Sequence, residues 1–165
     1  MPHNHTKAST IVFSKRYPFA DWPNREIPLV AAGVYAIWHN DTLIYCGMSG
    51  REISKAQTAG KTRYGLTTRL ASHASGRLSG DQFCVYVANR LIIPSLTPDD
   101  LPKFASGEYR LDYKTKDFIH DHLEYQYVVV ETSVEAYRIE NEGRSGKLFG
   151  ASKGSNAKYK DLAYV

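Results

Sequence analysis

Two short segments, 33–38 and 42–47, constrain the fold of this chain more than any other feature. Both are apolar and contain β-branched and aromatic residues, which favours strands. Asn and Asp stand between them, so a tight turn at 39–41 is expected to join them as an antiparallel hairpin. The expected cross-strand pairs are Trp38 with Thr42, Ile37 with Leu43 and Tyr35 with Tyr45.

This register decides where two phenol groups lie. Directly opposed residues share one face of a sheet, with Cβ atoms roughly 4.5–5.5 Å apart. Tyr35 and Tyr45 are therefore expected side by side. Because a slip of one residue would send them to opposite faces, the expectation depends on a three-residue loop at 39–41.

Composition limits the class of protein. The 165 residues are 42% hydrophobic and 23% charged, which is typical of one globular domain with a proper core. No apolar run approaches the roughly 20 residues of a membrane span, and residues 1–7 lack the apolar stretch of a signal peptide, which favours a cytoplasmic location. The net charge of +4 favours a polyanionic partner. Cys46 and Cys84 are expected to be buried, reduced thiols, with a disulfide as the alternative.

The rest of the chain divides into an arm, two inserted loops and further helices and strands. Residues 1–30 are polar and irregular, which indicates an arm that packs on a domain at 31–165. Segments 48–64 and 91–116 are rich in Gly, Ser, Pro or charge and are expected as inserted loops. The remaining patterns predict helices at 66–75, 117–123 and 133–142 and strands at 82–88 and 125–131. This order suggests an α/β (α+β) domain with a small, mainly antiparallel sheet.

Two of these helices carry polar residues at informative spacings. Arg69 and His73 are four residues apart, so they project from one face of the first helix. Glu140 lies beside the apolar stripe of the last helix. Glu142 instead falls on the face of Arg138, where a solvated ion pair is expected.

The order of these residues resembles the pattern of the GIY-YIG nuclease family. That pattern is a Gly-Ile-Tyr strand, a Tyr-Ile-Gly strand, a helix with Arg and a His four residues on, a helix with Glu, and a late Asn. The matching residues here are Gly33-Val34-Tyr35, Tyr45-Cys46-Gly47, Arg69 with His73, Glu140 and Asn156. The resemblance covers about 33–156, with Cys46 in place of the usual Ile and without the proline that often precedes the family's Asn.

The resemblance implies a three-stranded sheet flanked by helices and a divalent-metal-dependent DNA endonuclease. Glu140 would hold one Mg²⁺ or Mn²⁺ ion, because hard cations prefer oxygen ligands. Arg69 would bind phosphate oxygens, and Tyr35 would orient or deprotonate the attacking water. Tyr45 would bind phosphate or relay a proton, and His73 would share the role of base or the phosphate contacts. Asn156 would support the Glu140 loop by hydrogen bonding.

Basic residues of the inserted loops are candidate contacts to double-stranded DNA, with a solvated basic surface as the alternative. Several stand beside tyrosines, a pattern that suits phosphate contact and base stacking. The candidates are Arg51, Lys55, Lys61, Arg63, Arg110, Lys114 and Lys116.

A lone catalytic domain with inserted loops favours a type II restriction-like or defence nuclease. Cutting both strands would then need a homodimer on a palindromic site or sequential nicking. Two alternatives stay open: a nuclease that a partner protein directs in DNA repair or mobile elements, and a non-catalytic nucleic-acid-binding module of the same fold.

Overall fold

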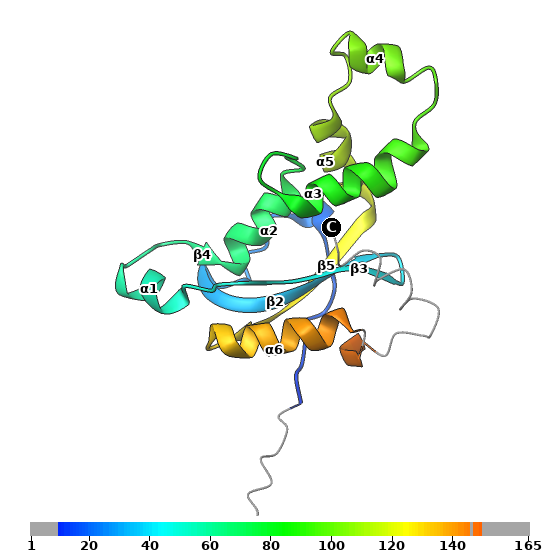
Figure 1. Cartoon of the computed structure of the whole chain (residues 1–165). Coiled ribbons are helices and arrows are strands. Elements are labelled where there is room, and N and C mark those ends of the chain that lie inside the picture. The colour runs from blue at the N-terminus through cyan, green and yellow to red at the C-terminus, as the bar shows by residue number, and fades with distance from the viewer. Residues whose placement is uncertain (1–9, 146, 150–165) are drawn as a thin grey trace, which may run out of the picture.

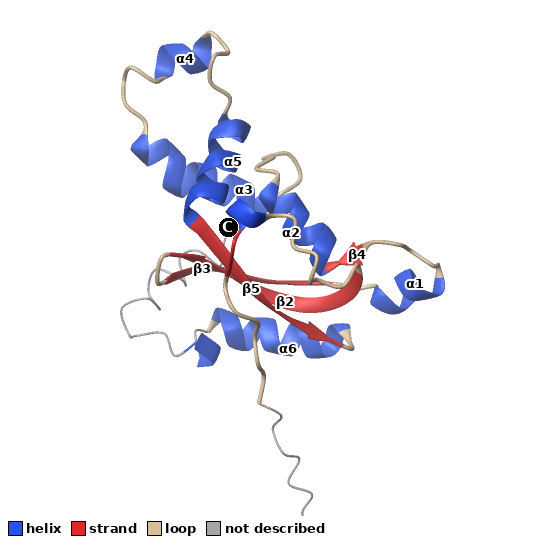
Figure 2. Ribbon diagram, turned by 180° about the vertical axis from the view of Figure 1, so that it is seen from behind, coloured by secondary structure: helices blue, strands red, loops and turns tan. Residues whose placement is uncertain are grey.

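A computed structural model describes residues 10–145 and 147–149. Its centre is a mainly antiparallel sheet of strand order β1-β5-β2-β3, with helices on both faces (Figures 1 and 2). The long strands are β2 (Val30–His39), β3 (Thr42–Ser49) and β5 (Leu123–Val130). Two short strands extend the sheet: β1 (Tyr17–Pro18) pairs with β5, and β4 (Tyr64–Gly65) runs parallel to β2. The expected α+β class with a mainly antiparallel sheet is confirmed.

The helices form one layer on each face of the sheet (Figure 1). One layer is α6 (Ser133–Arg144). The other is α2 (Leu66–Ala74), α3 (Gln82–Val87) and α5 (Leu111–His122). Helix α1 (Ile53–Thr58) follows β3, and α4 (Leu101–Ala105) projects away from the sheet in both views. Short helical turns cover Phe19–Asp21, Ala88–Ile92, Ile93–Ser95 and Lys147–Phe149.

Strand β2 belongs to two hydrophobic cores, because successive side chains of a strand point to opposite faces. Tyr35 and Ile37 pack in the core that includes Leu70 of α2. Val34 and Ala36 pack in the core that includes Ile139 of α6. Burial on both faces explains the nearly continuous apolar run of this strand.

The turn between β2 and β3 is shorter than expected. Asn40 and Asp41 alone connect the strands, because His39 pairs with Thr42. Asn40 has a φ of 53°, the left-handed conformation that Asn adopts more readily than most residues. The expected three-residue loop at 39–41 is therefore wrong.

A β-bulge shifts the ladder once more. Ile44 is an extra residue on β3, so the ladder steps from Trp38 with Leu43 to Ile37 with Tyr45. The expected opposition of Tyr35 and Tyr45 is wrong, since Tyr35 pairs with Gly47. The turn and the bulge each shift the register by one residue. Because the total shift is two, both phenols stay on one face.

The expected strand at 82–88 is wrong, since α3 and a π-helical turn occupy this segment. Asp81 caps α3, because its side chain accepts a hydrogen bond from the Cys84 N–H at 3.1 Å. The apolar run is buried, and a buried helix and a buried strand share that pattern. The hydrogen bond of Asp81 to the start of this segment identifies it as a helix, which the apolar pattern alone does not.

Helices also occupy both segments expected as loops. Helix α1 lies within 48–64, and α4 lies within 91–116. Helix α5 begins at Leu111, so the expected short helix at 117–123 is the end of a longer one. The expected helices at 66–75 and 133–142 and the strand at 125–131 are confirmed with small changes in their bounds.

Two further expectations concern burial and membranes. Cys46 and Cys84 are both buried thiols, as expected. Phe19 and Ile27, from the segment before β2, are buried in the core. Among the residues that the structure describes, no helix has the length and apolar character needed to cross a membrane.

Candidate active site

A cleft of about 340 Å³ lies at the outer edge of β3. Because β3 is an edge strand, side chains from the helical layers on both faces can reach this place. The cleft brings together five of the six catalytic candidates expected from sequence, namely Tyr35, Tyr45, Arg69, His73 and Glu140. The sixth, Asn156, lies outside the described residues.

The two tyrosines form one wall of the cleft. Their ring centroids are 6.1 Å apart and their planes differ by 25°. A Cβ atom on Gly47 would lie 2.5 Å from the Tyr35 hydroxyl and 2.9 Å from Cε1 of Tyr45. Only glycine at this position therefore leaves room for both rings as they stand.

Tyr35 contacts His73 of α2. The Tyr35 hydroxyl lies 2.8 Å from Nε2 of His73, and both side chains are buried. Burial raises the pKa of Tyr35 well above its ordinary value, Tyr45 adds to this, and Arg69 opposes it. Burial lowers the pKa of His73 and outweighs the opposing effect of Asp81. At neutral pH the contact thus joins a neutral phenol to a neutral imidazole.

Asp81 is the functional candidate that sequence reasoning missed. Its carboxylate lies 2.8 Å and 3.0 Å from Nδ1 of His73, and the Ser72 hydroxyl donates to it at 2.5 Å. Burial opposes its ionisation, but the hydrogen bond and the charge interaction with His73, together with the hydrogen bonds from Ser72 and Cys84, hold the pKa of Asp81 at about 2. Since His73 is neutral at neutral pH, its contact with Asp81 is a hydrogen bond rather than an ion pair at that pH. An Asp directly before an apolar run is an N-cap signal, and it was obscured by the expected strand at 82–88.

Glu140 is held at the opposite wall by α6 and β3. Its side chain is buried, and Nη2 of Arg144 donates to Oε1 at 2.9 Å. Burial raises the pKa of Glu140, while Arg144 and the Met48 N–H oppose this. Arg144 stands four residues after Glu140, a spacing at which helical side chains meet. The expected solvated pair on the other face, Arg138 with Glu142, is confirmed at 2.7 Å.

These groups offer a divalent cation few ligands. Asp81 also lines the cleft, but its carboxylate accepts hydrogen bonds from Ser72, His73 and Cys84. Glu140 accepts fewer hydrogen bonds and is therefore the more available carboxylate. Within the described part of the chain, no three His, Cys, Asp or Glu side chains gather as a metal site. Mg²⁺ commonly binds one or two carboxylates, waters and substrate phosphates. The residues therefore fit a cation that shares its ligands with a bound phosphate, and they do not fit one held by the protein alone.

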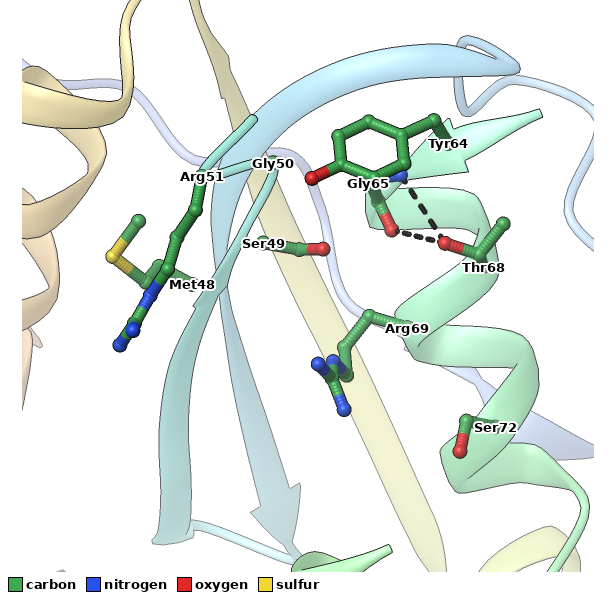
Figure 3. A pocket seen from close by; sticks show the side chains of 9 residues that line it. All are labelled: Met48, Ser49, Gly50, Arg51, Tyr64, Gly65, Thr68, Arg69 and Ser72. Atoms are coloured by element: carbon green, nitrogen blue, oxygen red, sulfur yellow. Dashed lines mark hydrogen bonds between the residues drawn. The ribbon is translucent and has the colours of Figure 1, made fainter. Parts of the chain in front are cut away.

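A second hollow of about 250 Å³ adjoins the cleft, with Arg51, Arg69 and Met48 in both linings. Figure 3 shows Arg51 on the β3 side of this hollow and Arg69 opposite it on α2. Neither guanidinium has an ion pair with any residue in the described ranges. Two arginines beside one cleft whose guanidinium groups form no ion pair with the described residues are suited to bind phosphate oxygens.

The other basic candidates lie elsewhere. Lys55 pairs with Glu52 at 2.5 Å, Lys61 lies over the ring of Tyr64 at 5.3 Å, and Arg63 is exposed. Of the remaining three, Arg110 directly precedes α5, and Lys114 and Lys116 lie on this helix. Lys114 lies over the ring of Tyr109 at 3.7 Å.

No model of a protein family, no curated protein and no solved structure matches this chain at a significant level. Function must therefore be argued from the geometry and chemistry of the cleft.

Proposed function

We propose that this chain is a divalent-metal-dependent DNA endonuclease of the GIY-YIG type. The observation that carries the proposal is the meeting of Tyr35, Tyr45, Arg69, His73 and Glu140 in one cleft. These residues come from two strands and two helices. In the sequence, Tyr35 and Glu140 are separated by more than half of the length of the chain. Phosphodiester hydrolysis needs a group that accepts a proton from water, positive charges that stabilise the negative charge of the phosphate, and a carboxylate that binds a metal ion. The cleft contains a side chain of each kind.

Phosphate binding is assigned to the arginines. Arg69 can place two N–H groups on two phosphate oxygens, and Arg51 stands across the adjoining hollow. Together with the net charge of +4, these arginines favour a polyanionic backbone that runs past the cleft. A flanking phosphate in the adjoining hollow would keep the scissile phosphate beside Tyr35.

Water activation is assigned to Tyr35 and His73. The phenol is neutral in the resting site, so it can take a proton from water only if its own proton moves onward. Nε2 of His73 lies 2.8 Å away and can accept that proton. Tyr45 stacks on Tyr35 and lines the same cleft, where it can bond a phosphate oxygen.

Glu140 is assigned to metal binding. A divalent cation bound there with the phosphate would stabilise negative charge on the phosphate and the leaving oxygen. The Met48 N–H and Arg144 orient the carboxylate, and burial shields it from water. Arg144 also keeps positive charge beside the phosphate path.

Two observations bear on the alternatives. A module that only binds nucleic acid needs no buried ionisable side chains, yet His73, Asp81 and Glu140 are all buried. Buried ionisable groups that line one cleft are typical of functional sites, which favours catalysis. Within the nucleases we favour a restriction-like or defence enzyme, and a partner-directed nuclease is the second candidate. Discrete cleavage ends on a sequenced plasmid would support the first, and random ends would support the second.

The catalytic test uses Glu140→Gln. Plasmid cleavage in Mg²⁺ should fall by roughly 10²-fold or more, and an EDTA control should abolish wild-type cleavage. DNA binding, measured by fluorescence anisotropy, should stay within a few-fold. Glu142→Gln is the matched control, because it lies on the same helix, is half-exposed and pairs with Arg138. Full activity of Glu140→Gln, or wild-type cleavage that ignores EDTA, would contradict the proposal.

A further inference from the structure

We infer that Asp81 is a positioning residue that sets which nitrogen of His73 carries the proton, and so aligns Tyr35 for catalysis. The consequence for catalysis rests on the proposed function. The hydrogen-bond arrangement itself does not, and it can be tested separately.

The contacts of His73 are unusually restrictive. The side chain of His73 is 3% exposed, and that of Asp81 is 2% exposed. Nδ1 faces the Asp81 carboxylate at 2.8 Å, and Nε2 faces the Tyr35 hydroxyl at 2.8 Å. The ring of Phe83 packs on the imidazole with 4.7 Å between centroids. These contacts leave the imidazole little freedom to turn.

Asp81 is held as firmly as His73. It caps α3 through the Cys84 N–H, and the Ser72 hydroxyl of α2 donates to its other oxygen at 2.5 Å. The carboxylate thus connects the start of α3 to the helix that carries His73. Its position is set by two helices and does not depend on the Tyr35 contact.

An ionised carboxylate can only accept hydrogen bonds. Nδ1 of His73 must therefore carry the hydrogen, and the lone pair of neutral His73 lies on Nε2. Because Nε2 is then an acceptor, the Tyr35 hydroxyl must donate to it. The lone pairs of the phenol oxygen are left for a hydrogen-bond donor in the cleft, such as the attacking water.

This arrangement defines the proton path. A water proton moves to the oxygen of Tyr35 as the phenol proton moves to Nε2 of His73, which becomes an imidazolium beside the Asp81 carboxylate. The electron pair of the water forms the new P–O bond, and the leaving oxygen departs with the electron pair of the broken P–O bond and takes a proton from solvent. His73 then returns its proton to Tyr35, which releases one to solvent.

The opposite tautomer would block this path. With hydrogen on Nε2, His73 would donate to Tyr35 and could not accept the phenol proton. Asp81→Asn should produce that state, because the amide oxygen can still cap α3 while the amide N–H₂ faces Nδ1. The variant therefore keeps the shape and the cap and changes the hydrogen-bond direction.

The experiment is ¹⁵N NMR of the His73 ring at neutral pH, combined with plasmid cleavage in Mg²⁺. We expect the Nδ1–H tautomer in the full wild-type chain and the Nε2–H tautomer in Asp81→Asn. Cleavage should fall by roughly 10²–10⁴-fold in the variant. Asp99→Asn is the matched control, because it removes the same charge from an exposed position and should change neither readout.

Three results would overturn the inference. They are an Nε2–H tautomer in the wild type, an unchanged tautomer in Asp81→Asn, and a changed tautomer with cleavage within about two-fold of wild type. If the tautomers are as expected but the wild type cleaves no DNA, the proposed function fails and the assignment of hydrogen-bond direction stands.

Discussion

Gly47→Ala tests the packing that brings the two tyrosines together. The added Cβ would lie 2.5 Å and 2.7 Å from Oη and Cζ of Tyr35 and 2.9 Å from Cε1 of Tyr45. Ordinary van der Waals contact begins at 3.4 Å, so a ring must move. Tyr35 has little room to do so, since it stacks on Tyr45 and bonds to His73.

The cost follows from these contacts. Overpacking a buried site costs about 1–3 kcal/mol, and loss of the Tyr35–His73 hydrogen bond adds about 1 kcal/mol. Alanine also restricts the unfolded chain, which offsets about 0.4–1 kcal/mol. The unfolding free energy should therefore fall by about 1–3 kcal/mol, which lowers Tm by roughly 3–10 °C for a chain of this size.

Urea and thermal unfolding measure the loss, and plasmid cleavage measures its effect on the cleft. Gly60→Ala is the control, because a Cβ there meets no atom within 4 Å and suffers only the strain of a φ of +65°. It should cost about 1 kcal/mol and leave the Tyr35–His73 contact and cleavage unchanged. A Gly47→Ala variant that is as stable and as active as wild type would refute the packing argument.

Two further predictions concern pH and salt. The folded-state pKa of Asp81, about 2, lies below its ordinary value of 3.8. Ionised Asp81 therefore stabilises the folded state by about 2 kcal/mol above pH 4, and this stability is lost as the pH falls through 2. In urea unfolding, the advantage of wild type over Asp81→Asn should shrink from pH 5 to pH 2.5, and a constant difference would contradict this assignment. DNA affinity should fall steeply with salt, and Arg51→Gln should reduce the slope by about one unit. Lys61→Gln, outside the cleft, should have less effect on cleavage than Arg51→Gln. If the DNA affinity of wild type does not change with salt, the assignment of phosphate contacts is contradicted.

Local patterns were sufficient for much of the scaffold. The strand around Tyr35 is evident from a nearly continuous apolar run, because it is buried on both faces. The helices that carry His73 and Glu140 are evident from apolar stripes that repeat with the period of a helix. The i,i+4 relation also separated Glu140, which lies in the cleft, from Glu142, which pairs with Arg138 in solvent. These features depend on residues within one or two turns of each other.

Other features do not follow from the spacing of apolar residues. The Tyr35 register is set by a two-residue turn and the bulge at Ile44, and the pattern of apolar residues shows neither of them. The α3 segment is helical because the Asp81 cap and the core around it favour a helix, although its composition also suits a strand.

The sequence by itself determined the fold class, the main strands and helices and the face on which most candidate residues lie, because these follow from short-range periodicity. Only the tertiary structure decided that the Asp81 carboxylate contacts Nδ1 of His73, and that His73 and Glu140, from helices on opposite faces of the sheet, line one cleft at the outer edge of β3. Hydrogen-bond partners in a buried site depend on positions to within a fraction of an ångström. Such precision arises only when the helices and the sheet pack together.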